Sequence, residues 1–151
     1  MHMESIGCSR GASEPMTERL RASLRNEAVA ILLLRLFLAY EWLNSGVGKI
    51  QSIQANGSAY FEGFSKVFVT VWAKSNPYPL MTDFLTNTAA PNAPMFVTTI
   101  AVLESLVGVS LLLGILAPLG ALGGTIMNAI YYLAAGHTSP STAGINLMMI
   151  G

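Results

Sequence analysis

The sequence predicts an all-α fold, a polytopic membrane helix bundle with three full spans and the start of a fourth. Of the 151 residues, 52% are hydrophobic and only 11% are charged, whereas a soluble domain carries roughly 25% charged residues. The apolar residues also form runs long enough to cross about 30 Å of hydrocarbon as helices. We expect one membrane domain at residues 27–151 behind a flexible polar tail at residues 1–26.

The apolar runs divide the chain into elements. Within the mixed segment 51–94, aromatic residues of the stretch 59–72 recur at spacings of three and four between polar ones. This aromatic spacing predicts an amphipathic helix that lies in the membrane interface, with its aromatic residues at the level of the headgroups. Pro77 and Pro79 then break the pattern, and MTDFL can add one more turn. Eight residues at the end of the sequence are too few to cross a bilayer, so the fourth segment is partial. The predicted spans are 28–50, 95–116, 119–135 and the partial 144–151.

Basic residues indicate how the chain is oriented. Arg19, Arg21 and Arg25 precede the first span, and the turn between the second and third spans has no charge. The positive-inside rule therefore predicts a cytoplasmic N-terminus for an integral protein of the cell membrane. The net charge of zero gives no reason to expect nucleic acid as a partner, and the lipid bilayer is the first partner we expect.

The cysteine and histidine content limits the cofactors that the chain could hold. A single cysteine, Cys8, forms no intrachain disulfide, CxxC pair or cysteine metal cluster. His137 has only His2 of the predicted tail as a possible companion, so we do not expect a bis-histidine haem. We therefore predict no metal site, and the sequence has no flavin or nucleotide motif.

Charged residues within the apolar runs are the first candidates for a functional site. Arg35 and Glu41 lie in the first span and Glu104 lies in the second. Such charges usually face a protein interior or a wet cavity and find partners there. Counting from the span ends puts Glu41 and Glu104 at about the same depth, about 20 Å from the inner face. We expect Arg35 or Glu41 to be the nearest ionisable partner of Glu104, and Lys49 to extend toward lipid phosphates.

Two segments carry a resemblance to a known family. LLLRLFLAYEWLNSGVGK, residues 32–49, has an Arg within a Leu run followed by Gly-x-x-Lys, and AVLESLVGVSLLLGILAPLGALGG, residues 101–124, contains Glu104, Gly108 and Gly114. These segments resemble the DoxX/DoxD family of small membrane proteins. NPYPLMTDFL and YYLAAGHTSPSTAGINLMMIG are similar to its DoxD branch, the membrane subunit of thiosulfate:quinone oxidoreductase.

The resemblance implies a four-helix membrane bundle that oxidises a reduced sulfur compound such as thiosulfate. It also implies quinone as the cofactor and a second small subunit of a redox complex as the partner. Two alternatives stay open, which are a non-catalytic membrane scaffold and a small permease with Glu41 and Glu104 on its path.

Polar residues of the third span reach the depth of the two glutamates and suit a quinone. Tyr131 and Tyr132 lie at about 18 to 20 Å, with Asn128 one turn below. Reduction of a quinone needs protons and hydrogen-bond donors at its ring oxygens, which Glu, Tyr and Asn supply. The candidate catalytic residues are therefore Glu41, Glu104 and Arg35, and the candidate quinone-binding residues are Tyr131, Tyr132 and Asn128.

Structural roles are the competing interpretation for several of these residues. Arg35 and Glu104 could be a buried pair that sets the helix register, and the tyrosines could be packing aromatics. Gly120 and Gly124 form a GxxxG pattern, which permits close helix packing within one bundle or in a homo-oligomer. We favour packing within one bundle.

Overall fold

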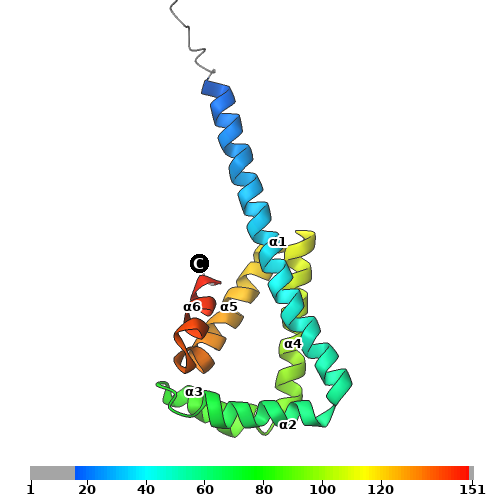
Figure 1. Ribbon diagram of the computed structural model, residues 1–151, viewed down its shortest axis with the longest axis vertical. Coiled ribbons are helices and arrows are strands. Elements are labelled where there is room, and N and C mark those ends of the chain that lie inside the picture. Colours follow the sequence, from blue (N-terminus) through cyan, green and yellow to red (C-terminus); the bar gives the residue numbers. More distant parts are fainter. Residues whose placement is uncertain (1–15, 150–151) are drawn as a thin grey trace, which may run out of the picture. The chain divides into compact units, whose positions relative to one another are not determined.

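The structure is a computed structural model of the 151-residue chain, and it describes residues 16–149. The chain divides into two compact units, Met1–Leu34 and Arg35–Gly151, and the site discussed below lies entirely within the second. Throughout the described range the regular elements are helices (Figure 1). Cys8 and His2 lie outside the described residues, so the predictions made for them stay predictions.

The first helix, α1, is longer than the predicted first span. It runs over Met16–Asn56, so residues 16–26 of the predicted tail are helical and the helix continues six residues beyond Ile50. The segment after Ile50 contains no Pro or Gly before Gly57, whose positive φ of 52° marks the end of the helix. This extension changes which residues of α1 lie level with the next long helix.

The aromatic stretch between α1 and the next long helix forms a short helical pair, and a turn that includes Asn76 and Pro77 separates it from a second pair that begins at Pro79. Phe68 is only 2% exposed and lies in a core cluster with Phe64 and Trp72 packed beside it. These aromatic side chains therefore pack against the protein interior, and the depth of this segment in the membrane stays a prediction. The elements are α2 (Ser58–Val67), the π-helical η1 (Phe68–Trp72), α3 (Pro79–Phe84) and the π-helical η2 (Leu85–Ala89).

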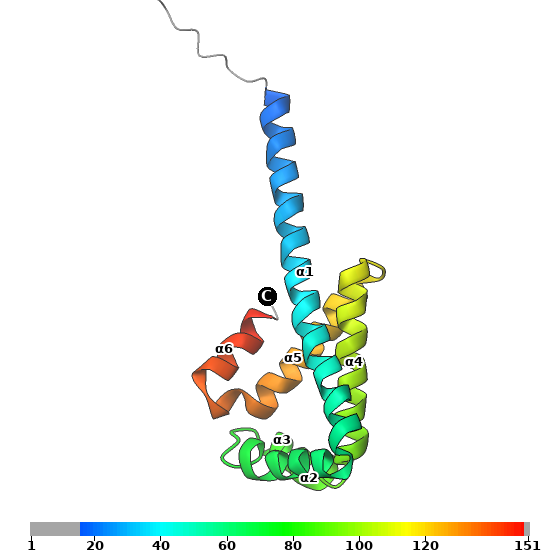
Figure 2. The same ribbon diagram turned by 45° about the vertical axis from the view of Figure 1, so that its right-hand side comes forward.

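The second half of the chain contains two long helices and a short one. Both Figure 1 and Figure 2 show that the axis of α2 runs crosswise to the axis of α4, and that the lower end of α4 lies next to α2. Gly114 and Leu116 adopt positive φ in the turn that separates α4 from α5, and α6 packs against α5. The elements are α4 (Ala93–Leu113), α5 (Ala117–Ala135), the 3-10 turn η3 (Gly136–Thr138) and α6 (Pro140–Met148).

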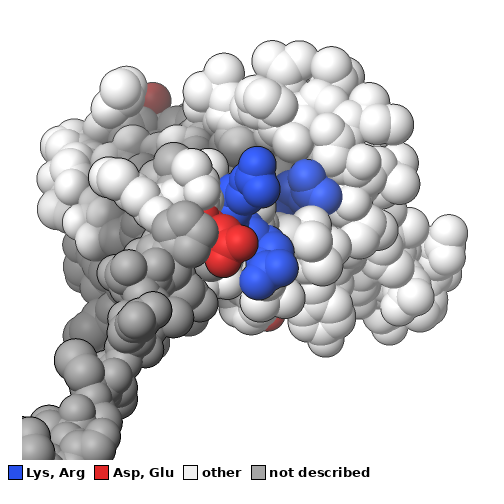
Figure 3. All heavy atoms as spheres, turned by 90° about the horizontal axis from the view of Figure 1, so that it is seen from above, with Lys and Arg blue, Asp and Glu red and all other residues white. Residues whose placement is uncertain are grey.

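Two helices of the described chain, α1 and α4, are long and apolar enough to cross a membrane. The predicted third span forms a helix, α5, but it does not join this pair, so three full spans stay a prediction. Large apolar side chains on the outer faces of α4 and α5 are exposed, including Leu106 and Leu122. In the view of Figure 3, uncharged side chains make up most of the described surface. Such a surface suits lipid better than water.

Glycines allow α1 and α4 to pack closely in antiparallel register. A methyl group on Gly46 would lie 2.6 Å from the backbone nitrogen of Ser105, and one on Gly108 would lie 2.8 Å from that of Leu43. Neither position has room for a side chain, so the two backbones approach as only glycine permits. The close contacts place Gly46 opposite Ser105 and Leu43 opposite Gly108.

The two glycines of the GxxxG pattern also face neighbours within the bundle. A methyl group on Gly120 would lie 2.7 Å from Ser110 Oγ, and one on Gly124 would lie 3.2 Å from the Trp42 ring. Their small size is therefore used in packing α5 against α4 and α1, as we favoured from the sequence.

Candidate functional site

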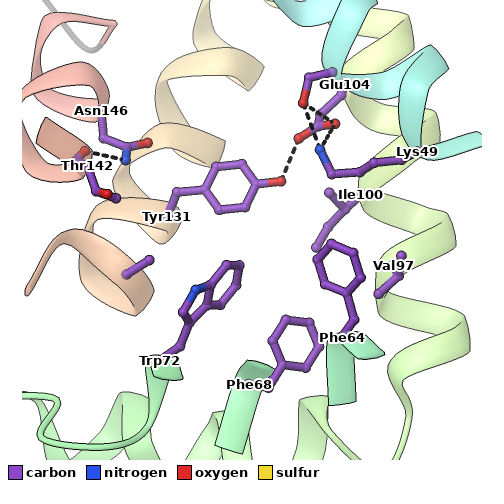
Figure 4. A pocket seen from close by; sticks show the side chains of 12 residues that line it. Lys49, Phe64, Phe68, Trp72, Val97, Ile100, Glu104, Tyr131, Thr142 and Asn146 are labelled. Carbon is purple, nitrogen blue, oxygen red and sulfur yellow. Dashed lines mark hydrogen bonds and ion pairs between the residues drawn. The ribbon is translucent and has the colours of Figure 1, made fainter. Parts of the chain in front are cut away.

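Glu104 of α4 is the centre of a buried polar cluster (Figure 4). Its side chain is 2% exposed, and Lys49 Nζ lies 2.7 Å from its Oε2 atom. Ser45 Oγ donates to the same oxygen at 3.1 Å, and the Tyr131 hydroxyl donates to Oε1 at 2.6 Å. Three donors, one of them cationic, therefore compensate a carboxylate that would otherwise be costly to bury.

Local helix geometry brings the members of this cluster together. Ser45 and Lys49 are one turn apart on α1, so they share a face, and Lys49 Nζ donates to Ser45 Oγ at 2.7 Å. The close contact at Gly46 places that face level with Glu104. Tyr131 reaches the carboxylate from α5. The cluster thus joins three helices and depends on their register.

A cavity of about 360 Å³ adjoins the cluster. Side chains from α2 and η1 form an aromatic wall, and α6 supplies polar groups at another side (Figure 4). Single-turn π-helical segments such as η1 occur frequently at functional sites. The cavity is lined by Ser45, Lys49, Phe64, Phe68, Trp72, Val97, Ile100, Glu104, Tyr131, Ala135, Thr142 and Asn146.

The aromatic wall is a continuous row of rings that ends at the polar cluster. The ring centroids of Phe64 and Phe68 are 5.9 Å apart, and those of Phe68 and Trp72 are 5.2 Å apart. Trp72 then meets Tyr131 edge-on at 6.3 Å. These are the separations that aromatic rings favour in packed interiors. The cavity therefore combines apolar ring surfaces with a hydrogen-bonding end.

The ionisable partner of Glu104 is Lys49, so the prediction that it would be Arg35 or Glu41 is wrong. Arg35 lies against Gly114, ten residues along α4 from Glu104 and thus about 15 Å away along the helix axis. Glu41 does not line the cavity and makes no side-chain hydrogen bond within residues 16–149. The cause is the extension of α1 to Asn56. The contacts of Gly46 with Ser105 and of Gly108 with Leu43 place residue 47 of α1, six residues beyond Glu41, level with Glu104, a shift of about 9 Å along the helix axis.

Lys49 was also expected to extend toward lipid phosphates, and this prediction is wrong as well. Because α1 continues past it, Lys49 is not at a helix end, and its ammonium group turns inward to the carboxylate. The sequence does contain one signal: Ser45 and Lys49 are four residues apart and therefore share a helix face, and Gly46 beside them permits a close helix contact. This signal does not identify Glu104 as the residue on the other helix that meets them.

The three predicted quinone-binding residues are separated in the structure. Tyr131 lines the cavity, whereas Tyr132 and Asn128 do not. The Tyr132 ring packs against Gly136, where a methyl group would lie 3.0 Å from it. Asn128 is 3% exposed, and its Nδ2 atom has no hydrogen-bond partner in the described part of the chain. Of these three residues, only Tyr131 therefore remains a candidate ligand contact at this cavity.

Comparison with known proteins adds a family match. The family model described as DoxX matches residues 30–137, a range that contains Lys49, Glu104 and Tyr131. The matched range stops before α6, so Thr142 and Asn146 of the cavity wall lie beyond it. Searches of curated proteins and of solved structures found no match.

Proposed function

The chain belongs to the DoxX family, and on this basis we propose that it is the membrane subunit of a quinone-linked oxidoreductase. The proposed electron donor is a reduced sulfur compound such as thiosulfate, which the likeness to the DoxD branch implies, and the proposed partner is a second small subunit. The observation that carries the proposal is the hydrogen-bonded row of Lys49, Glu104 and Tyr131 at the end of an aromatic cavity.

The lining residues fit the ring of a quinone. Small-molecule sites usually measure about 300 to 1,000 Å³ and are mostly apolar with a few placed polar groups. The cavity of about 360 Å³ meets both conditions. Phe64, Phe68 and Trp72 offer apolar surface to a planar ring. An ammonium group has three N–H donors, and Lys49 uses two of them on Ser45 and Glu104, which leaves one for a ring oxygen.

Each residue of the row has a distinct proposed role. A bound quinone supplies the capacity to accept two electrons and two protons. The Lys49 ammonium group holds a positive charge and a proton at the cavity wall, where it stabilises negative charge that develops on a ligand oxygen. Glu104 orients both Lys49 and Tyr131 through its two oxygens. The Tyr131 hydroxyl is a second proton-bearing group at the same end.

Tryptophan fluorescence tests whether the cavity binds a quinone. Trp72 lines the cavity, whereas Trp42 packs against Gly124 outside it. In the Trp42→Phe variant, a short-chain naphthoquinone should quench the remaining emission in a saturable manner. The matched Trp72→Phe variant should lose this saturable component. Equal quenching in both variants would place the quinone elsewhere or nowhere.

Turnover tests the roles of the polar row. We expect Glu104→Gln to lower thiosulfate-driven quinone reduction at least tenfold in membranes that contain the partner, an effect of about 1.4 kcal/mol or more on the barrier. Glu41→Gln is the control, because Glu41 does not line the cavity. An unchanged rate in Glu104→Gln would remove the row from the mechanism.

Two other measurements distinguish the alternative functions. Solute flux into liposomes without quinone binding would favour the permease. Stable assembly with the partner subunit without quinone binding would favour the scaffold.

A further inference from the structure

Arg35 packs against the turn that joins α4 to α5. A methyl group on Gly114 would lie 3.1 Å from Arg35 Nη1 and 3.4 Å from its Cζ atom. Gly114 has a φ of 71° at the end of α4, and α5 begins at Ala117. Because Gly114 has no side chain, the turn leaves room for the planar guanidinium group.

The guanidinium group has no counterion among residues 16–149. In that range the Lys49–Glu104 contact is the ion pair that the structure contains, and Arg35 Nε is buried without a hydrogen-bond partner. Arginine keeps its charge at every physiological pH. An unpaired charge in apolar surroundings is costly, so this position favours binding of an anion.

An apolar groove begins at the same turn. It lies between α4 and α5, has a volume of about 450 Å³ and includes Leu113 and Leu116, which are close neighbours of Gly114 in the chain. Leu106 and Leu119 continue the groove along the two helices, and all four leucines are more than half exposed. A groove with leucine walls suits a hydrocarbon chain, not a polar ligand.

We propose that Arg35 and this groove bind an anionic phospholipid, with the phosphate on the guanidinium group and an acyl chain along the groove. A guanidinium group can donate to two phosphate oxygens at once. Basic pockets between helices on the cytoplasmic side of membrane proteins bind such headgroups, and this is the side predicted for the Arg35 end. This lipid site does not depend on quinone binding at the cavity.

Thermal unfolding of the purified full chain in neutral detergent tests the lipid site. Phosphatidylglycerol should raise the midpoint of wild-type unfolding in a saturable manner, whereas phosphatidylcholine should have a smaller effect and inorganic phosphate none. In Arg35→Gln, the phosphatidylglycerol concentration at half effect should rise about tenfold, as loss of a charged hydrogen bond predicts. Lys66→Gln removes one exposed positive charge from α2 and should respond as wild type does.

Two further variants keep the test decisive if Arg35→Gln does not fold. Arg35→Lys keeps the charge but loses the forked geometry, so its half-effect concentration should lie between those of wild type and Arg35→Gln. Leu106→Trp fills part of the groove and should weaken the response while Arg35 is intact. A wild-type response in both variants would overturn the lipid site. A midpoint raised by inorganic phosphate alone would also overturn it, in favour of a free-anion site.

Discussion

Arg35 and Lys49 are two cations on one helix whose surroundings differ completely. Lys49 lies 2.7 Å from the buried carboxylate of Glu104, whereas Arg35 lies over Gly114 with no ion pair in the described chain. They are about 21 Å apart along the axis of α1. The comparison shows that a charged side chain in an apolar helix can be neutralised by a counterion within the protein, as Lys49 is by Glu104, or can remain available to a bound ligand, as Arg35 does. Which of the two occurs depends on whether the helix or turn packed against the charge carries a side chain of opposite charge.

The two regions also differ in what surrounds the cation. At Lys49, α1, α4 and α5 supply hydrogen-bonding groups, and α2 and η1 supply an aromatic wall. At Arg35, the glycine turn and the residues that line the exposed leucine groove provide no acidic side chain. The first arrangement suits chemistry on a small ring, and the second suits an amphiphile.

The largest expected effect comes from breaking the pair at the Lys49 end. Glu104→Leu would leave the Lys49 ammonium group without its counterion, which should lower the free energy of unfolding by about 3 to 5 kcal/mol. Arg35→Gln should cost much less, because Arg35 has no ion pair in the described chain to lose. Denaturant unfolding in bicelles measures both. Adding Lys49→Met to Glu104→Leu should recover part of the loss, and strictly additive losses would argue against a direct pair.

The next expected effect separates the two adjacent tyrosines of α5. Tyr131→Phe removes the hydroxyl that donates to Glu104 at 2.6 Å, so it should lower the free energy of unfolding by about 1.5 to 3 kcal/mol. Tyr132→Phe is the matched control and should change the stability by less than about 0.5 kcal/mol, because its hydroxyl makes no hydrogen bond within residues 16–149. Similar losses in both variants would contradict the assignment.

Two glycines of α1 test whether the close helix contact sets the register. A methyl group on Gly46 would lie 2.5 Å from Ser105 Oγ, whereas one on Gly48 would meet nothing within 4 Å. Gly46→Ala should therefore destabilise the protein by about 1 to 3 kcal/mol. Gly48→Ala should be neutral or stabilising by up to about 1 kcal/mol, because alanine favours helix. The same unfolding assay compares them, and a neutral Gly46→Ala would mean that α1 and α4 are not held this closely.

The smallest expected effect concerns the turn at the Arg35 end. Gly114→Ala places a side chain at a φ of 71°, which should cost about 1 to 2 kcal/mol of stability. The new methyl group would also press on the guanidinium group, so the response to phosphatidylglycerol should weaken in the thermal assay. A weakened response with unchanged stability would show that the turn is relaxed and that only the lipid site is disturbed.

Much of the fold could be predicted from composition and apolar runs. Long apolar runs predicted α1 and α4 although each contains at least one charged residue, and Pro118 predicted the break before α5. The end of α1 was predicted six residues too early, because the polar segment after Ile50 has no apolar pattern although its residues continue a helix well. The aromatic spacing of α2 was visible, but spacing alone cannot tell whether a ring faces lipid or the protein interior.

The sequence by itself determined that charges lie in apolar helices and therefore need partners. It identified Glu104 and Tyr131 as members of one polar layer, and the hydrogen bond between them agrees with that prediction. Only the tertiary structure decided that the cation is Lys49 and that Arg35 belongs to another region. The physical reason is register: a side chain reaches only the residues level with it, and a shift of six residues, about 9 Å along the axis, exchanges one partner for another. That register is set by the length of α1 and by the glycine contacts between helices, which no local pattern contains.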